Sequence, residues 1–182
     1  MVGNEIIVNP GIAGPRGRLE TGIISGTDKP GTCMQLKAAT AAVNGNFTFE
    51  AFNQNFDGDA APVIVLLEDS DRGKIYSDAY VTGTLCKLYW PVVGDELNML
   101  VDASLGAIAI GDKFQIDDST GQLVAATAYV ADYATPGLDT EAEVIVAVNL
   151  LKNKPALTFQ ALEAVSDPSA DVWVHCRCIR NC

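Results

Sequence analysis

Short apolar segments separated by glycine, proline and aspartate fill this chain from Thr32 onward. The clearest case is the pair 113–116 and 122–126, which flanks the sequence Asp-Asp-Ser-Thr-Gly at 117–121. An aspartate can bond its own backbone in such a turn, and a glycine can adopt a positive φ, so the pair is predicted to form a hairpin. Segments 85–93 and 171–179 alternate in the period of two that is typical of a half-buried strand.

The strand pattern recurs along the chain with few helix signals. The predicted strands cover residues 33–36, 47–51, 61–67, 85–93, 97–101, 113–116, 122–126, 143–150, 157–165 and 171–179. Many short strands spaced by turn residues are typical of an all-β compact sandwich or barrel with few helical turns. The steps Gly94-Asp95 and Gly111-Asp112 both precede a predicted strand, and we interpret them as common turn chemistry rather than as a duplication.

The first thirty-two residues are rich in glycine and proline, which predicts an extended arm over residues 1–31 ahead of a β-rich domain over residues 32–182. The arm carries more branched aliphatics than a free linker would, so they are expected to pack on this subunit or on a neighbour. We take its apolar and arginine residues as interface candidates: Ile6, Ile7, Val8, Ile12, Arg16, Arg18, Ile23 and Ile24.

Charge and hydropathy limit the partners of the chain. Twelve Lys and Arg against twenty-three Asp and Glu in 182 residues give a formal net charge of −11, which argues against a nucleic-acid partner. The longest apolar runs fall far short of the roughly 20 residues that cross a bilayer, so we expect no membrane segment, and no secretory signal is visible. Hydrophobic residues make up 48% of the chain, which suggests surface that an assembly buries.

Residues that could carry chemistry are few. The one histidine, His175, lies in a predicted strand without a second group to act with it, and we interpret it as a strand histidine held by a neighbour rather than as a catalytic residue. Together with His175, Cys176, Cys178 and Cys182 could hold zinc, but His175 and Cys176 are adjacent in the strand and point to opposite faces, which favours Cys176 and Cys178 as core thiols. A disulfide from Cys182 to Cys33 or Cys86 is a further alternative. We therefore predict no catalytic residue, cofactor or metal.

The order of several short segments resembles the capsid decoration, or cement, proteins of tailed bacteriophages over residues 27–179. The segments that carry the resemblance are Ala60-Ala61-Pro62, Leu66-Leu67-Glu68-Asp69, Tyr80-Val81-Thr82-Gly83, Pro91-Val92-Val93-Gly94-Asp95-Glu96, Ile110-Gly111-Asp112-Lys113, Asp118-Ser119-Thr120-Gly121-Gln122-Leu123 and Phe159-Gln160-Ala161-Leu162-Glu163-Ala164. The arm and the cysteine-rich end depart from the pattern.

The resemblance implies a non-enzymatic structural virion protein. Such proteins are made in the host cytoplasm, bind the outer surface of the expanded capsid, often as homotrimers, and bridge subunits of the major capsid protein. An alternative is a receptor- or carbohydrate-binding β module of the virion surface, for which exposed aromatic residues would be the binding groups. Its candidates are Tyr76, Tyr80, Tyr89, Trp90 and Trp173.

Overall fold

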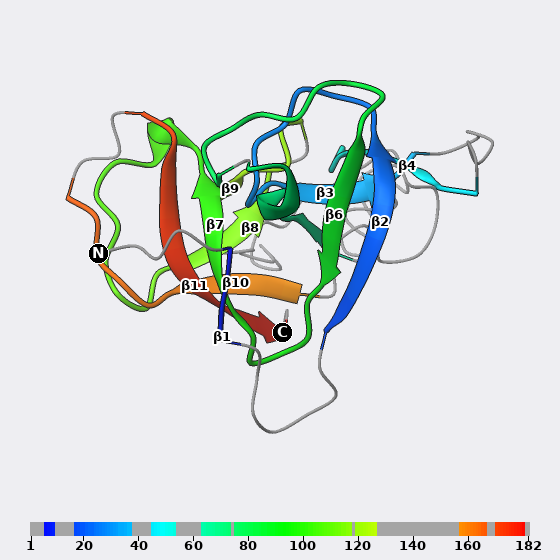
Figure 1. The fold of residues 1–182 in the computed structure, drawn as a ribbon. Coiled ribbons are helices and arrows are strands. Elements are labelled where there is room, and N and C mark those ends of the chain that lie inside the picture. The colour runs from blue at the N-terminus through cyan, green and yellow to red at the C-terminus, as the bar shows by residue number, and fades with distance from the viewer. Residues whose placement is uncertain are drawn as a thin grey trace, which may run out of the picture.

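The computed structural model describes residues 6–9, 17–37, 45–53, 63–73, 75–117, 119–126, 157–166 and 170–180. This part of the chain is all-β apart from two 3-10 turns, η1 (Ser70–Arg72) and η2 (Ala103–Leu105). Figure 1 shows the strands gathered into two groups that lie side by side. The prediction of a compact all-β fold with few helical turns is confirmed.

The first group is a closed five-stranded barrel with the strand order β2-β4-β3-β5-β6. Its strands are β2 (Arg18–Ile24), β3 (Cys33–Leu36), β4 (Thr48–Ala51), β5 (Ile64–Leu66) and β6 (Leu85–Trp90). Neighbouring strands are antiparallel except β2 and β4, which pair in parallel at Ile23 and Ile24. Closure leaves each strand a partner on both sides, at least along part of its length.

The second group has the order β1-β7-β11-β10-β8-β9, and a further pairing of β7 with β9 closes five of its strands into a ring. Its strands are β1 (Ile7–Asn9), β7 (Glu96–Val101), β8 (Lys113–Ile116), β9 (Leu123–Ala125), β10 (Leu157–Ala161) and β11 (Val172–Arg180). β1 pairs with the start of β7 and lies outside the ring.

The two barrels share one topology. When β2–β6 are matched in order with β7–β11, every pairing corresponds, including the single parallel one, β2–β4 against β7–β9. The two Gly-Asp turns do not correspond under this match, because both precede strands of the second barrel, β7 and β8. The two steps are therefore local turns, as predicted. The two barrels repeat the same order and pairing of strands.

The barrels also share a core. One face of β3, β5 and β6 fills the first barrel through Met34, Ile64, Leu66, Cys86 and Leu88. The opposite face of the same strands contributes Cys33, Val65 and Tyr89 to the core of the second barrel, together with Leu97, Met99 and Phe159. Burial on both faces explains the continuous apolar run at 63–67, which a half-exposed strand would not need.

Residues 18–24 form a strand that was not expected from the sequence. The glycine and proline content of the first thirty-two residues predicts an extended arm rather than an uninterrupted strand, but β2 spans Arg18–Ile24 and pairs with both β6 and β4. Gly22 lies within this strand at a place where the Phe49 ring packs closely against the backbone. A Cβ at residue 22 would lie 2.4 Å from Cδ2 of Phe49, so the position requires glycine. Residues 1–5 and 10–16 lie outside the described residues, so the arm stays a prediction there.

The predicted hairpin of β8 and β9 is confirmed. The strands pair antiparallel, and Asp117 Oδ1 accepts hydrogen bonds from the backbone N–H groups of Ser119 and Thr120 at 3.0 and 2.8 Å. Partial burial alone would raise the pKa of Asp117, but these bonds, together with those donated by the Ser119 and Thr120 hydroxyls, lower it below its ordinary value. The strands predicted at 33–36, 97–101 and 171–179 are also found, within a residue or two at their ends, whereas the strand predicted at 143–150 lies outside the described residues.

Candidate interaction surface

Exposed apolar side chains gather at the end of the first barrel where β2 finishes. Phe47, Val81 and Leu85 are exposed there, together with Leu36. Backbone contacts place the first three near Ile23 and Ile24. Ile23 pairs with Leu85, its N atom donates to Phe47 O at 2.9 Å, and Ile24 N donates to Thr84 O at 3.1 Å. Leu36 is one strand further away, because it pairs with Phe49 of β4, which in turn pairs with Ile24. We call Leu36, Phe47, Val81 and Leu85 the rim.

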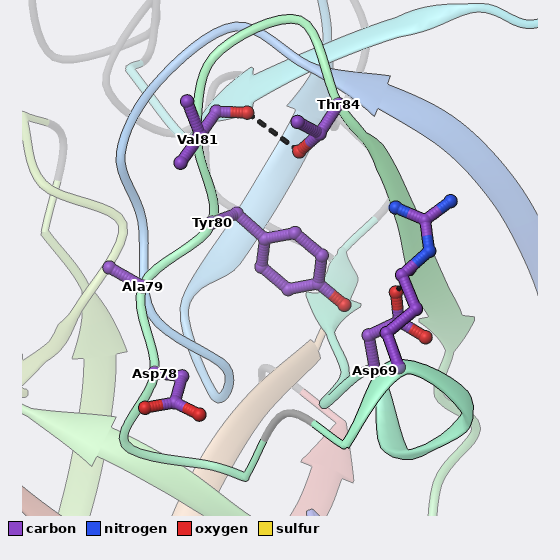
Figure 2. Close-up of a pocket in the computed structure, with 7 residues that line it drawn as sticks. Asp69, Asp78, Ala79, Tyr80, Val81 and Thr84 are labelled. Carbon is purple, nitrogen blue, oxygen red and sulfur yellow. Dashed lines mark hydrogen bonds and ion pairs between the residues drawn. The ribbon is translucent and has the colours of Figure 1, made fainter.

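A pocket adjoins the rim at Val81. It is lined by residues from the loop before β6 and from the segment after β5: Asp69, Arg72, Asp78, Ala79, Tyr80, Val81 and Thr84. Figure 2 shows the Tyr80 ring across the middle of this pocket and the Thr84 hydroxyl turned to the backbone of Val81. Thr84 Oγ1 donates to Val81 O at 2.6 Å, which closes the turn that leads into β6.

The polar groups of this pocket are engaged within the protein. The Tyr80 hydroxyl donates to Leu67 O at 2.8 Å, and burial raises the pKa of Tyr80. The carboxylate of Asp69 is buried, with Arg72 Nε at 3.2 Å and Lys87 Nζ at 3.9 Å. A general base or nucleophile needs a neighbour that activates it and an open side toward a substrate. The Tyr80 hydroxyl and the Asp69 carboxylate thus have partners within the protein, and Val81 is exposed beside them.

The predicted interface residues fall into three groups. Ile6 and Ile24 are fully buried, one in each core cluster, so they pack on this subunit, which is the first of the two alternatives raised by the sequence. Arg18 is exposed on β2 and Ile23 is half-buried beside Leu85. Ile7 and Val8 lie on β1, and Ile12 and Arg16 lie outside the described residues.

The rim was not predicted from the sequence. Leu36 and Leu85 lie at the ends of strands, Phe47 precedes a strand, and Val81 lies in a turn. From the sequence, each is therefore expected to belong to a half-buried strand or to a loop. Their exposure depends on which strand ends meet, and that is fixed by long-range pairing. The one available signal was apolar side chains next to glycine turns, at Val81-Thr82-Gly83.

His175, Cys176 and Cys178 lie on β11, where their side chains alternate between the two faces of the strand as predicted. His175 Nε2 lies 3.5 Å from Glu96 Oε2, and Arg177 Nη2 lies 2.7 Å from the other oxygen of that carboxylate. Cys176 and Cys178 are buried on the opposite face, away from His175. In the described part of the chain, no group of three or more His, Cys, Asp or Glu is arranged to hold a metal, and Cys33 and Cys86 are free thiols.

We expect four of the five cysteines to resist alkylation in the folded protein. Burial raises the pKa of Cys86 and of Cys178 to about 12, and it raises the pKa of Cys33 and Cys176 as well. The thiolate is the reactive form, so iodoacetamide at pH 8 should modify these residues at least about a hundredfold more slowly than in the unfolded chain. Mass spectrometry should find at most one label before denaturation and five after it. Two or more labels at the unfolded rate would contradict the buried placement.

The aromatic residues considered for ligand binding are largely packed. Tyr80 and Tyr89 are buried, and Trp90 Nε1 donates to Glu20 Oε2 at 2.8 Å. Tyr76 and Trp173 form an edge-to-face pair with their ring centroids 4.8 Å apart. Rings held in this way offer little open face to a sugar.

Comparisons with known proteins add no assignment. Neither the scan of protein-family models nor the search of curated proteins finds a match for this sequence. Within the described residues, no helix has the length and apolar character needed to cross a membrane.

Proposed function

We propose that this protein is a structural component of a tailed-phage virion, which binds the outside of the assembled capsid and ties neighbouring subunits of the major capsid protein together. The observation that carries the proposal is the rim, because it gathers exposed apolar side chains at one end of a rigid barrel. The resemblance of segment order over residues 27–179 and the formal net charge of −11 support it, since an acidic exterior keeps copies from aggregating.

The mechanism follows from binding linkage. A protein that binds the assembled shell but not its free subunits stabilises the shell by mass action, and many copies on one particle multiply that effect. The two barrels share one buried core, so the described part of the chain is already ordered before it binds. Binding would therefore cost this part little conformational entropy. The rim and the pocket beside Val81 would receive apolar groups of the capsid surface.

The test is binding to expanded heads assembled from the major capsid protein encoded with this chain. Phe47→Asp combined with Val81→Asp should lower the number of bound copies at least about tenfold, because two charges would be buried against the shell. The matched control is Val93→Asp with Ile110→Asp. Val93 lies in the turn that joins β6 to β7 and Ile110 in the turn before β8, and they are as exposed as the rim pair, at 54% and 69% against 50% and 65%.

Cosedimentation with the heads measures the occupancy of each variant. The proposal requires binding of the wild type and of the control pair, and loss of binding by the rim pair. A wild-type protein that stays in the supernatant at micromolar concentration would overturn the function. Equal losses from both pairs would overturn the assignment to the rim. A glycan array probes the alternative of a carbohydrate-binding module, and a specific hit together with no shell binding would favour that alternative.

A further inference from the structure

Part of β2 has a free edge. Ile23 N donates to Phe47 O and Ser25 N donates to Phe49 O, so the odd-numbered residues of this strand direct their backbone groups toward the β4 side. β4 reaches β2 at Ile23 and Ile24 alone. Among the described residues, no strand pairs with β2 on that side at Leu19 and Thr21. Leu19 is 66% exposed, and Thr21 is exposed as well.

The equivalent position in the second barrel is filled. Asp102 N donates to Leu123 O in β9, just as Ser25 N donates to Phe49 O in β4. Four residues earlier, Asn98 N donates to Ile6 O, where β1 pairs antiparallel with the start of β7. Under the match of the two barrels, Asn98 corresponds to Thr21. The fold therefore has room at this position for one more antiparallel strand, and in the first barrel the described residues leave it vacant.

The free edge is complementary to itself. If two β2 strands run antiparallel about a two-fold axis through Leu19, the backbone groups of Leu19 face those of its copy, and Arg18 lies opposite Glu20 of the second copy. Residues in such non-hydrogen-bonded positions have Cα atoms about 4.5 Å apart, the closest cross-strand spacing. Arg18 and Glu20 already lie on one face of β2, with Arg18 Nη2 3.7 Å from Glu20 Oε1. The pairing thus joins opposite charges twice and brings two exposed leucines together.

We propose that the occupant of this edge is β2 of a second copy, and that the contact joins two copies through a continuous sheet. A two-fold contact between identical patches is the commonest form of subunit association, and an exposed strand edge is its ready template. The contact does not depend on the proposed capsid function. It leaves any threefold association intact, because it would join two trimers rather than subunits within one.

A charge exchange tests the pairing on the purified protein. Arg18→Glu places a carboxylate opposite Glu20 of the second copy, and Glu20→Lys places an ammonium group opposite its Arg18, so each variant repels its own copies. A mixture of the two variants restores opposite charges at both positions. Each single variant should weaken self-association at least about tenfold, and the equimolar mixture should recover it. Lys113→Glu on β8 is the control, because it makes the same change of net charge as Arg18→Glu at an exposed residue away from the edge.

Light scattering coupled to size-exclusion chromatography measures the molar mass of the wild type, of each variant and of the mixture. The wild type and Lys113→Glu should have an even multiple of 19.2 kDa, each single variant should have half the wild-type mass, and the mixture should return to the wild-type mass. Thermal unfolding checks that Glu20→Lys folds, since Glu20 also accepts a bond from Trp90. A monomeric wild type, variants with unchanged mass, or folded variants that stay apart when mixed would overturn the proposal. Shell binding by the rim is a separate measurement and would be unaffected by that failure.

Discussion

Gly121→Ala is expected to lower the melting temperature of the protein by roughly 10 °C. Gly121 has φ +68°, a conformation that costs a residue with a Cβ about 1–2 kcal/mol. The added Cβ would also lie 2.3 Å from the carbonyl oxygen of Cys33 and 3.1 Å from the N atom of Phe52. Backbone atoms cannot move aside as a flexible side chain can. A further 1–3 kcal/mol or so for overpacking brings the total to about 2–5 kcal/mol.

The clash falls where the barrels meet. The β8–β9 hairpin touches the first barrel at Gly121, whose carbonyl oxygen accepts a hydrogen bond from Cys33 N at 2.8 Å. Gly73→Ala is the matched control, because Gly73 has φ +69° and nothing within 4 Å of the added Cβ. Its cost should be the conformational part alone, about 1–2 kcal/mol. Equal losses in the two variants, measured by thermal and urea unfolding, would contradict the close approach at Gly121.

Asp95→Ala is expected to destabilise the protein by about 3 kcal/mol. Asp95 is fully buried in the turn between β6 and β7, and its Oδ2 accepts bonds from the Tyr89 hydroxyl at 2.7 Å and from Val92 N at 2.9 Å. Burial, followed by the hydrogen bond and charge of Asp95, raises the pKa of Tyr89. A hydrogen bond to a charged group contributes about 1.5–3 kcal/mol, and its removal here leaves the buried Tyr89 hydroxyl and the partly buried Val92 N–H without this acceptor.

Asp112 provides the comparison within the same chain. It makes the same turn before β8, where its Oδ2 accepts from Ala109 N at 2.8 Å, but it is exposed. Water can replace that bond, so Asp112→Ala should cost under about 1 kcal/mol. Asp95→Asn keeps an acceptor and should recover part of the loss. If denaturant unfolding gives Asp95→Ala and Asp112→Ala the same free-energy change, the buried bond to Tyr89 does not carry the stability assigned to it.

Local patterns predicted the strands, and long-range pairing explains what they missed. Alternation in 171–179 was enough to place Cys176 and Cys178 in the core, because side-chain direction in a strand has a period of two. Gly22 reads as a strand breaker in sequence, yet it is the residue over which Phe49 packs, a contact that involves residues far apart in the chain. The doubled topology leaves no repeat in the sequence that we detected, since barrel closure constrains strand order more than residue identity.

The candidate surface was predicted less well than the fold, for the same reason. Apolar residues near the N-terminus drew attention because glycine and proline surround them, but Ile6 and Ile24 belong to the cores. Phe47 and Val81 belong to the rim because β4 and β6 both meet β2 at one end of the first barrel. An exposed patch is a property of several segments together, and a single segment does not reveal it.

Imaging of expanded phage heads with and without this protein tests the capsid assignment most directly. We expect additional density on the outer surface of every head incubated with the protein, with two fused barrels resolved and the Ile24 end of the first barrel against the shell. Heads that look identical in both preparations, at protein concentrations that saturate any micromolar site, would contradict it.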